Sequence, residues 1–229
     1  MNETLILPNR NEKLWGQRYL LFQLVFLGSF LSFAAGLLGI TLSALTLNVL
    51  YFGVNFIVVA LLCRNFLTES LGYGLHNLLR CLLVSVGGFA VYQLLMHLLA
   101  LLIVSICPDF ANVNDQNLSS LGQENYALMV ICTVLLVPAT EETLYRGILF
   151  GSVYRRSRAA AYLISTLVFC LVHITGYIGT AEPLTLLLCF LQYVPAGVCL
   201  AAAYEASGSI LSPILIHTAV NAIGMMAMR

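Results

Sequence analysis

Three charged side chains fall within the six residues Glu141-Glu142-Thr143-Leu144-Tyr145-Arg146, directly after a long apolar run. Only 9% of the 229 residues are charged and 60% are hydrophobic, so such a cluster is conspicuous. A charge at membrane depth costs roughly 2.5–3.5 kcal/mol on insertion scales and normally marks a functional site. These carboxylates are therefore the first candidates for chemistry.

Helical spacing divides this cluster into two parts. Neighbouring helix positions point about 100° apart, so Glu141 and Glu142 face different directions. Glu142 and Arg146 are four positions apart and can pair on one face, with the acid N-terminal to the base. This pair would make the charge tolerable and leave Glu141 as an unpaired carboxylate, suited to act as a general base. An ion-pair clamp at an interfacial helix end would explain the same residues without any chemistry.

Two histidines in later apolar segments are the candidate partners of Glu141. Phe169 precedes His173 by four positions, so the two share a helix face. Asn221 follows His217 by four positions, and two stacked polar side chains in an apolar helix indicate a site more strongly. A lone intramembrane histidine also serves as a hydrogen-bonding residue in helix packing. Two further histidines without such partners are assigned this structural role: His76 and His97.

One carboxylate, two histidines and one amide from three helices can converge in a bundle. They could activate water, with Glu141 as base, His173 orienting it, and His217 with Asn221 stabilising an oxyanion. Alternatively, Glu141, His173 and His217 could hold zinc with one position open for water. The sequence contains no His-Glu-x-x-His motif, which excludes a zincin. A Cys170 nucleophile is disfavoured, because a reactive thiolate is unfavourable in apolar surroundings.

Membrane-spanning helices must position these residues. The apolar content exceeds the roughly 45–50% of soluble domains, and about 20 apolar residues cross a bilayer. We therefore predict an all-α, polytopic transmembrane helix bundle with about seven spans (six to eight), forming a single membrane domain. Residues 1–125 carry no motif, and residues 126–229 carry all three. The predicted spans are Tyr19–Ile40, Leu45–Cys63, Leu78–Ile106, a helix from Tyr126, Ala160–Tyr177, Leu184–Tyr204 and Ile210–Met228.

Polar links separate the spans and suggest their orientation. Arg64–Asn77 is predicted as a link with Gly72 and Gly74 as helix breakers, and Asp109–Glu124 as a long polar loop. Seven alternating spans place the basic residues of the short links on one side, which the positive-inside rule assigns to the cytoplasm together with the N-terminus. These residues are Arg10, Lys13, Arg18, Arg64, Arg80, Arg155, Arg156 and Arg158. The net charge of zero gives no indication of nucleic-acid binding.

The order and spacing of the three motifs resemble a known family. Glu141-Glu142-x-x-x-Arg146, Phe169-x-x-x-His173 and His217-x-x-x-Asn221 look like the motifs of the CPBP intramembrane proteases, the type II CAAX prenyl endopeptidase and bacteriocin-processing (Abi-like) family. The turn Ser207-Gly208-Ser209 is similar to the family's lead-in to its third motif, which usually has Thr where Ser207 stands. The resemblance covers roughly residues 135–224.

This resemblance implies an intramembrane endopeptidase that hydrolyses a peptide bond of a membrane-associated peptide or protein. By carry-over, Glu141 and His173 activate water, and His217 with Asn221 forms the oxyanion site or completes a metal site. Arg146 would act structurally through Glu142. Members are described as metalloproteases, and a metal-free glutamate mechanism has also been proposed, so zinc is an open alternative here.

The chain resembles the bacterial members of the family, which are linked to bacteriocin immunity and peptide maturation. The expected location is a bacterial plasma membrane, with the lipid bilayer and a membrane substrate as partners and no nucleic acid. The alternative function is a non-catalytic immunity or scaffold protein that binds a peptide in the same cavity. A proton-coupled transporter is a third reading, disfavoured because no inverted repeat is recognisable. The sequence indicates neither the substrate nor the oligomeric state.

Overall fold

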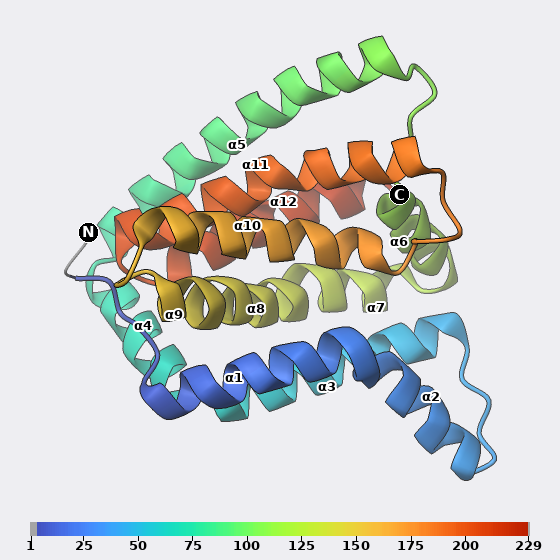
Figure 1. Cartoon of the computed structure of the whole chain (residues 1–229), viewed down its shortest axis with the longest axis horizontal. Helices are drawn as coiled ribbons and strands as arrows, with labels where there is room; N and C mark the ends of the chain where they lie inside the picture. Colours follow the sequence, from blue (N-terminus) through green and yellow to red (C-terminus); the bar gives the residue numbers. More distant parts are fainter. Residues whose placement is uncertain (1–3, 229) are drawn as a thin grey trace.

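The computed structural model describes residues 4–228, which form a bundle of helices without any strand in that range (Figure 1). Within it, six helices are long and apolar enough to cross a membrane. The helix α12 (Leu211–Ala227) is also apolar, but at 17 residues it is slightly shorter. The predicted all-α membrane bundle is thus confirmed. The six long spans are Arg10–Leu37 (α1, η1 and α2), Ala44–Leu62 (α3), Leu78–Ile106 (α5), Tyr126–Val153 (α7 to α9), Arg158–Thr175 (α10) and Pro183–Ser207 (α11).

Two of these spans contain π-helical segments, in which the turn is wider than in an α-helix. The first span consists of α1 (Arg10–Phe22), η1 (Gln23–Leu27) and α2 (Gly28–Leu37). The fourth carries two such segments close to the Glu-Glu pair. In chain order it consists of α7 (Tyr126–Val130), η2 (Ile131–Leu136), α8 (Val137–Glu142), η3 (Thr143–Phe150) and α9 (Gly151–Val153).

The first span begins earlier than predicted, at Arg10 instead of Tyr19. Asn9 caps it: its side chain accepts a hydrogen bond from the backbone N–H of Glu12, and Glu12 accepts one from Asn9 in return. This capping box satisfies two backbone donors that would otherwise lack partners. The buried Glu12 also accepts a hydrogen bond from the backbone N–H of Phe66, which ties the start of α1 to α4.

Both segments predicted as links between spans contain helices, so the predicted helix breaks at Gly72 and Gly74 and the predicted long polar loop are wrong. The first is α4 (Arg64–His76), and the second contains α6 (Val113–Glu124). The helix α4 buries residues at intervals of four, namely Phe66, Ser70 and Gly74, and so presents one face to the bundle. Tertiary packing of that face outweighs the low helix propensity of its glycines.

The helix α4 holds the turn between α11 and α12. Ser209 donates a hydrogen bond to the carbonyl of Ser70, and the hydroxyl of Ser70 accepts one from the backbone N–H of Ile210. Gly208 lies in this turn with a φ of 81°, a left-handed conformation suited to glycine. The predicted breaker Gly74 therefore acts as a point of close approach between α4 and this turn.

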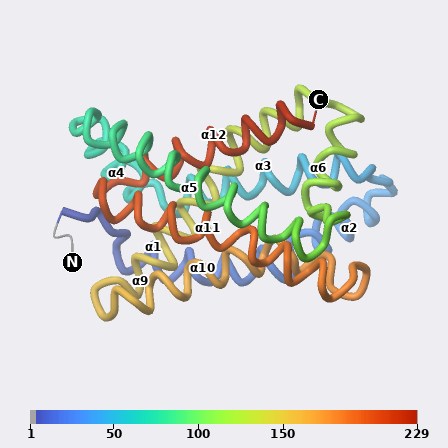
Figure 2. The backbone as a smooth tube through the Cα atoms, turned by 90° about the horizontal axis from the view of Figure 1, so that it is seen from above, coloured from blue at the N-terminus to red at the C-terminus, as the bar shows by residue number. Residues whose placement is uncertain are grey.

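The elements gather at two ends of the bundle (Figure 1). The N-terminal segment, α4 and α9 lie at one end, on the left of the view, whereas α6 and the C-terminus lie at the other. The predicted alternation of the links is therefore confirmed. The assignment of the first end to the cytoplasm stays a prediction. Seen from above, α11 lies between α5 and α10 and packs against both (Figure 2).

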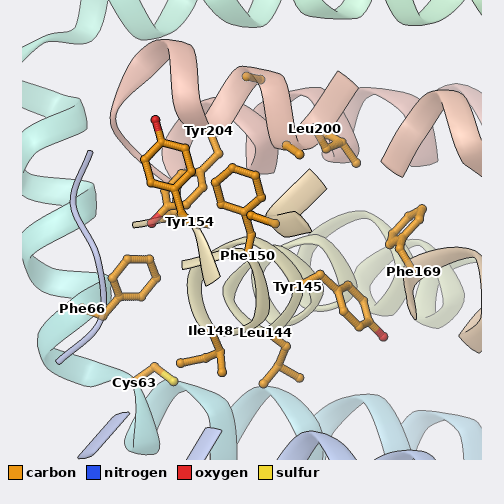
Figure 3. Close-up of a cluster of buried hydrophobic side chains, with 14 of the residues drawn as sticks. Cys63, Phe66, Leu144, Tyr145, Ile148, Phe150, Tyr154, Phe169, Leu200 and Tyr204 are labelled. Carbon is orange, nitrogen blue, oxygen red and sulfur yellow. The ribbon is translucent and has the colours of Figure 1, made fainter. Parts of the chain in front are cut away.

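The largest hydrophobic cluster surrounds η3 (Figure 3). Leu144 and Ile148 point to one side of this helix, near Cys63 of the α3–α4 junction, and Phe150 points to the other side, near Tyr204. The rings of Phe150 and Tyr204 make an edge contact with centroids 5.9 Å apart. Packing on all sides fixes the rotation of the segment that carries the charged motif.

We expect Gly74→Ala to destabilise the protein and Gly72→Ala, on the same helix, to leave it unchanged or more stable. A Cβ atom at Gly74 would lie 2.5 Å from the hydroxyl of Ser209, which its hydrogen bonds hold in place, whereas one at Gly72 would meet nothing within 4 Å. Overpacking costs about 1–3 kcal/mol, and an open helical glycine gains up to about 1 kcal/mol as alanine. The midpoints of thermal unfolding of the two variants, measured in one detergent, check this expectation. Equal midpoints would contradict the close approach of Gly74 to Ser209.

Candidate active site

The predicted ion pair between Glu142 and Arg146 is present and buried. Nη1 of Arg146 lies 3.0 Å from Oε1 of Glu142, and both side chains have 0% exposure. The π-helical segment η3 begins directly after Glu142. Such wide turns are rare and are found frequently at functional sites. The pair neutralises a charge that would otherwise be uncompensated in an apolar interior.

Arg146 also ties its helix to two neighbours. Its Nη2 lies 3.5 Å from the carbonyl oxygen of Ala196 and 3.4 Å from that of Gly197, both on α11. Its guanidinium carbon lies 4.5 Å from the ring centroid of Phe169 on α10, a cation–π contact. Phe169, predicted as a supporting residue, thus contacts the buried base directly.

His217 binds Glu142, not Glu141. Its Nδ1 lies 2.7 Å from Oε1 of Glu142. The sequence grouped His217 with Glu141 and His173 around a water molecule or a metal ion and did not predict this bond to Glu142. Because a carboxylate accepts and does not donate, Nδ1 carries the proton, and Nε2 is the nitrogen left for another partner. Oε1 of Glu142 is shared by Arg146 and His217, while Oε2 has no hydrogen-bond partner in the described structure.

Asn221 is held by a defect in the hydrogen bonding of η2. Its Nδ2 donates to the carbonyl of Thr133 at 2.8 Å. In an α-helix that carbonyl would accept from Val137, but the N–H of Val137 bonds to Cys132 instead. The next residue is Pro138, which has no N–H. The side chain of Asn221 thus supplies the missing donor, and its second N–H stays available.

His173 is fixed by its own helix and by α11. Its Nδ1 lies 2.7 Å from the carbonyl oxygen of Phe169 and so donates to it, which leaves Nε2 as an acceptor. Its ring stacks on that of Tyr193, with centroids 4.1 Å apart and an interplanar angle of 27°. His173 also lies within electrostatic range of Glu141 and His217. The ring therefore has little freedom to rotate.

One cavity of about 920 Å³ brings the predicted residues together. Its lining includes the four predicted catalytic residues: Glu141, His173, His217 and Asn221. Glu141 makes no hydrogen bond to any of residues 4–228, and its Oε2 is buried without a partner. The predicted division of the Glu-Glu pair therefore holds in the geometry: Glu142 lies in a buried network, and Glu141 lines the cavity.

Several polar residues of the cavity wall were missed in the sequence. They come from segments without a motif, and their only signal was a polar side chain beside an apolar run. Those on α3, α11 and the start of α6 include Tyr51, Asn55, Gln192, Tyr193, Asn112 and Asp115. Outside the spans, loss of hydration raises the pKa of Asp115 and that of Tyr177, because burial disfavours both charged forms.

The donor set does not form a ready metal site. Among residues 4–228, no three His, Cys, Asp or Glu side chains are grouped so that they could hold a metal ion. His173 and His217 each keep Nε2 free, as metal-ligating histidines do, but these two rings and Glu141 are not grouped closely enough to share one ion. We therefore derive no step through the proposed zinc ligands Glu141, His173 and His217, and metal dependence stays a prediction.

Arg146→Met should destabilise the protein by about 3–5 kcal/mol, because it leaves the buried carboxylate of Glu142 without its cation. The double variant Glu142→Gln/Arg146→Met should recover much of this loss. The matched control is Arg158→Met, which removes the ion pair of Arg158 with Glu205. Because the side chain of Arg158 is 62% exposed, this variant should lose less stability than Arg146→Met. Unfolding of all variants in one detergent measures these differences. A double variant as unstable as Arg146→Met would contradict the pairing.

Comparisons with known proteins agree with the motifs. Residues 123–223 match the family described as Type II CAAX prenyl endopeptidase Rce1-like. The UPF0177 protein YxdF of Lactococcus lactis subsp. lactis (strain IL1403) is 30% identical over 95 residues, 42% of this chain and 47% of that relative. The match thus spans about half the length of the relative. No solved structure matches the chain. The resemblance predicted from the three motifs is therefore confirmed over residues 123–223, the part of the chain that is Rce1-like.

Proposed function

We propose that this protein is an intramembrane endopeptidase that hydrolyses a peptide bond of a membrane-associated peptide or protein. The observation that carries this proposal is the cavity that Glu141, His173, His217 and Asn221 line from three helices, namely α8, α10 and α12. Within it, Glu141 is a carboxylate without a partner in the described structure, while its neighbour Glu142 is neutralised. The Rce1-like match over the same helices supports a protease in general terms.

In the proposed reaction, Glu141 removes a proton from a water molecule as the water oxygen attacks the peptide carbonyl carbon. The acceptor Nε2 of His173 orients this water. The second N–H of Asn221 donates to the oxyanion, and His217 does so as an imidazolium, with its Nδ1–H bonded to Glu142 and its Nε2–H directed to the oxyanion. The C–N bond then breaks, and Glu141 passes its proton to the leaving amine. Atoms and charge balance, and Glu141 is regenerated.

We also propose that the N-terminus is cytoplasmic and that the membrane is a bacterial plasma membrane. The argument is the gathering of basic residues in the N-terminal segment, α4 and the turn after α9, which share one end of the bundle. The helix α6 and the C-terminal end would then face outward.

Glu141→Gln and His173→Ala should each lower cleavage of a membrane peptide by at least about 100-fold, because each removes a group acting on the water. The matched control is His97→Ala, since His97 is an exposed histidine of a span and lies outside the cavity. Cleavage by purified protein in micelles, with monodispersity checked for each variant, is the measurement. Full activity of Glu141→Gln would refute the mechanism. Peptide binding without cleavage by the unmodified protein, and unchanged binding in these variants, would favour the non-catalytic binding protein.

Cleavage should persist after exhaustive chelation, because no three His, Cys, Asp or Glu side chains of the described residues are grouped as metal ligands. Metal content by mass spectrometry and activity after chelation are measured on the same sample. Stoichiometric zinc that disappears in His173→Ala and His217→Ala, together with loss of activity on chelation, would instead assign the metal mechanism.

A further inference from the structure

The charged side chains that line the cavity carry one sign. Glu141 on α8 and Asp115 on α6 are acidic, and no Lys or Arg of residues 4–228 lines the cavity. The nearest base, Arg146, points into the buried network with Glu142 and makes no contribution to the wall. Two carboxylates facing one cavity with poorly hydrated walls create a negative potential, which favours a cation there.

Asp115 has no structural role that explains its position. The N-terminus of α6 is already capped by Asn112, whose Oδ1 accepts hydrogen bonds from the backbone N–H groups of Asn114 and Asp115. In the described part of the chain, the carboxylate of Asp115 forms no ion pair and no hydrogen bond appears for it. A carboxylate that is neither a cap nor part of a salt bridge is available to a ligand.

The segment that carries Asp115 is fixed against the catalytic helices. Nδ2 of Asn112 donates to Oε1 of Gln192 on α11 at 2.7 Å, and the hydroxyl of Tyr177 donates to Oδ1 of Asn114 at 3.3 Å. These bonds hold the first turn of α6 over the cavity. A fixed charge discriminates between ligands better than a mobile one, because no ordering is needed on binding.

Asp115 also lines the same cavity as the proposed reaction centre. The wall of this cavity includes Tyr193, whose ring stacks on His173. The hydroxyl oxygen of Tyr193 is buried, lines the same cavity and lies near the side-chain amides of Asn112 and Asn114. The hydroxyl of Tyr193, whose ring stacks on His173, and the exposed carboxylate of Asp115 thus line one polar part of the cavity.

We propose that this subsite, formed by Asp115 and Tyr193 at the α6 end of the cavity, selects substrates with a positively charged side chain, lysine or arginine, near the scissile bond. Asp115 is the specificity-determining residue, and Tyr193 offers a hydroxyl to the same group. A free C-terminal carboxylate is disfavoured there, because the described cavity wall offers no basic residue to neutralise it. The proposal rests on the proposed function for the scissile position, but binding can be measured apart from cleavage.

The probe is a series of fluorescent, amidated peptides of alanine and leucine in which one Lys, Gln or Glu is moved along the chain. Fluorescence anisotropy measures binding to Glu141→Gln protein, which cannot cleave by the proposed mechanism, in a neutral detergent. At one or more positions, Lys should bind about fivefold or more tighter than Gln, and Glu more weakly than Gln. Asp115→Asn should abolish this preference. The matched control, Asp109→Asn, changes a nearby acid outside the cavity and should retain it.

A Lys preference that survives Asp115→Asn, a preference for Glu, equal binding of all peptides or no binding at all would each overturn the proposal. Cleavage of the same peptides by the unmodified chain is a separate measurement. Charge-dependent binding without any cleavage would contradict the proposed protease activity while leaving the subsite intact. Cleavage without charge preference would contradict the proposed subsite while leaving the proposed protease activity intact.

Discussion

The carboxylate of Glu142 is the point on which the rest of the site depends. A buried carboxylate in an apolar bundle is strongly unfavourable unless cations and donors surround it. Here one oxygen, Oε1, bonds both Arg146 on its own span and His217 on α12. Arg146 in turn reaches α11 and Phe169 of α10. A single charge therefore ties four spans together, and its neighbour Glu141, about 100° round the helix, is left to line the cavity.

Irregular helix geometry provides the attachment points for this arrangement. At η2, the N–H of Val137 bonds to the carbonyl of Cys132, and Pro138 has no N–H, so neither donates to the carbonyl of Thr133. The side-chain amide of Asn221 on α12 donates a hydrogen bond to this carbonyl instead. An unsatisfied carbonyl in an apolar interior is costly, so the defect and the amide stabilise each other. The result is that α12 bonds the fourth span at two heights, through His217 and through Asn221, which fixes its rotation.

The sequence predicted what depends on local spacing. Long apolar runs indicated the spans, and the four-residue interval indicated the Glu142–Arg146 pair. The bond from His217 to Glu142 was not predictable, because it joins residues 75 positions apart and leaves no local pattern. The helices α4 and α6 were missed for a related reason. Their polar, glycine-containing sequences are stabilised by contacts such as Ser70 with Ser209 and Asn112 with Gln192, which only the folded chain supplies.

The two ends of the bundle differ in polar and charged residues, and this difference bears on how water and substrate would enter the cavity. Hydrolysis inside a lipid-embedded bundle needs water, and an apolar wall excludes it. At the end that carries α6, the wall is rich in amides and hydroxyls, including Asn112, Gln192 and Tyr177, which offer water successive hydrogen-bond partners. The basic elements lie at the opposite end. In the proposed reaction, water and a cationic substrate group would therefore enter from the same end, and the apolar remainder of the wall would contact the lipid-soluble part of the substrate.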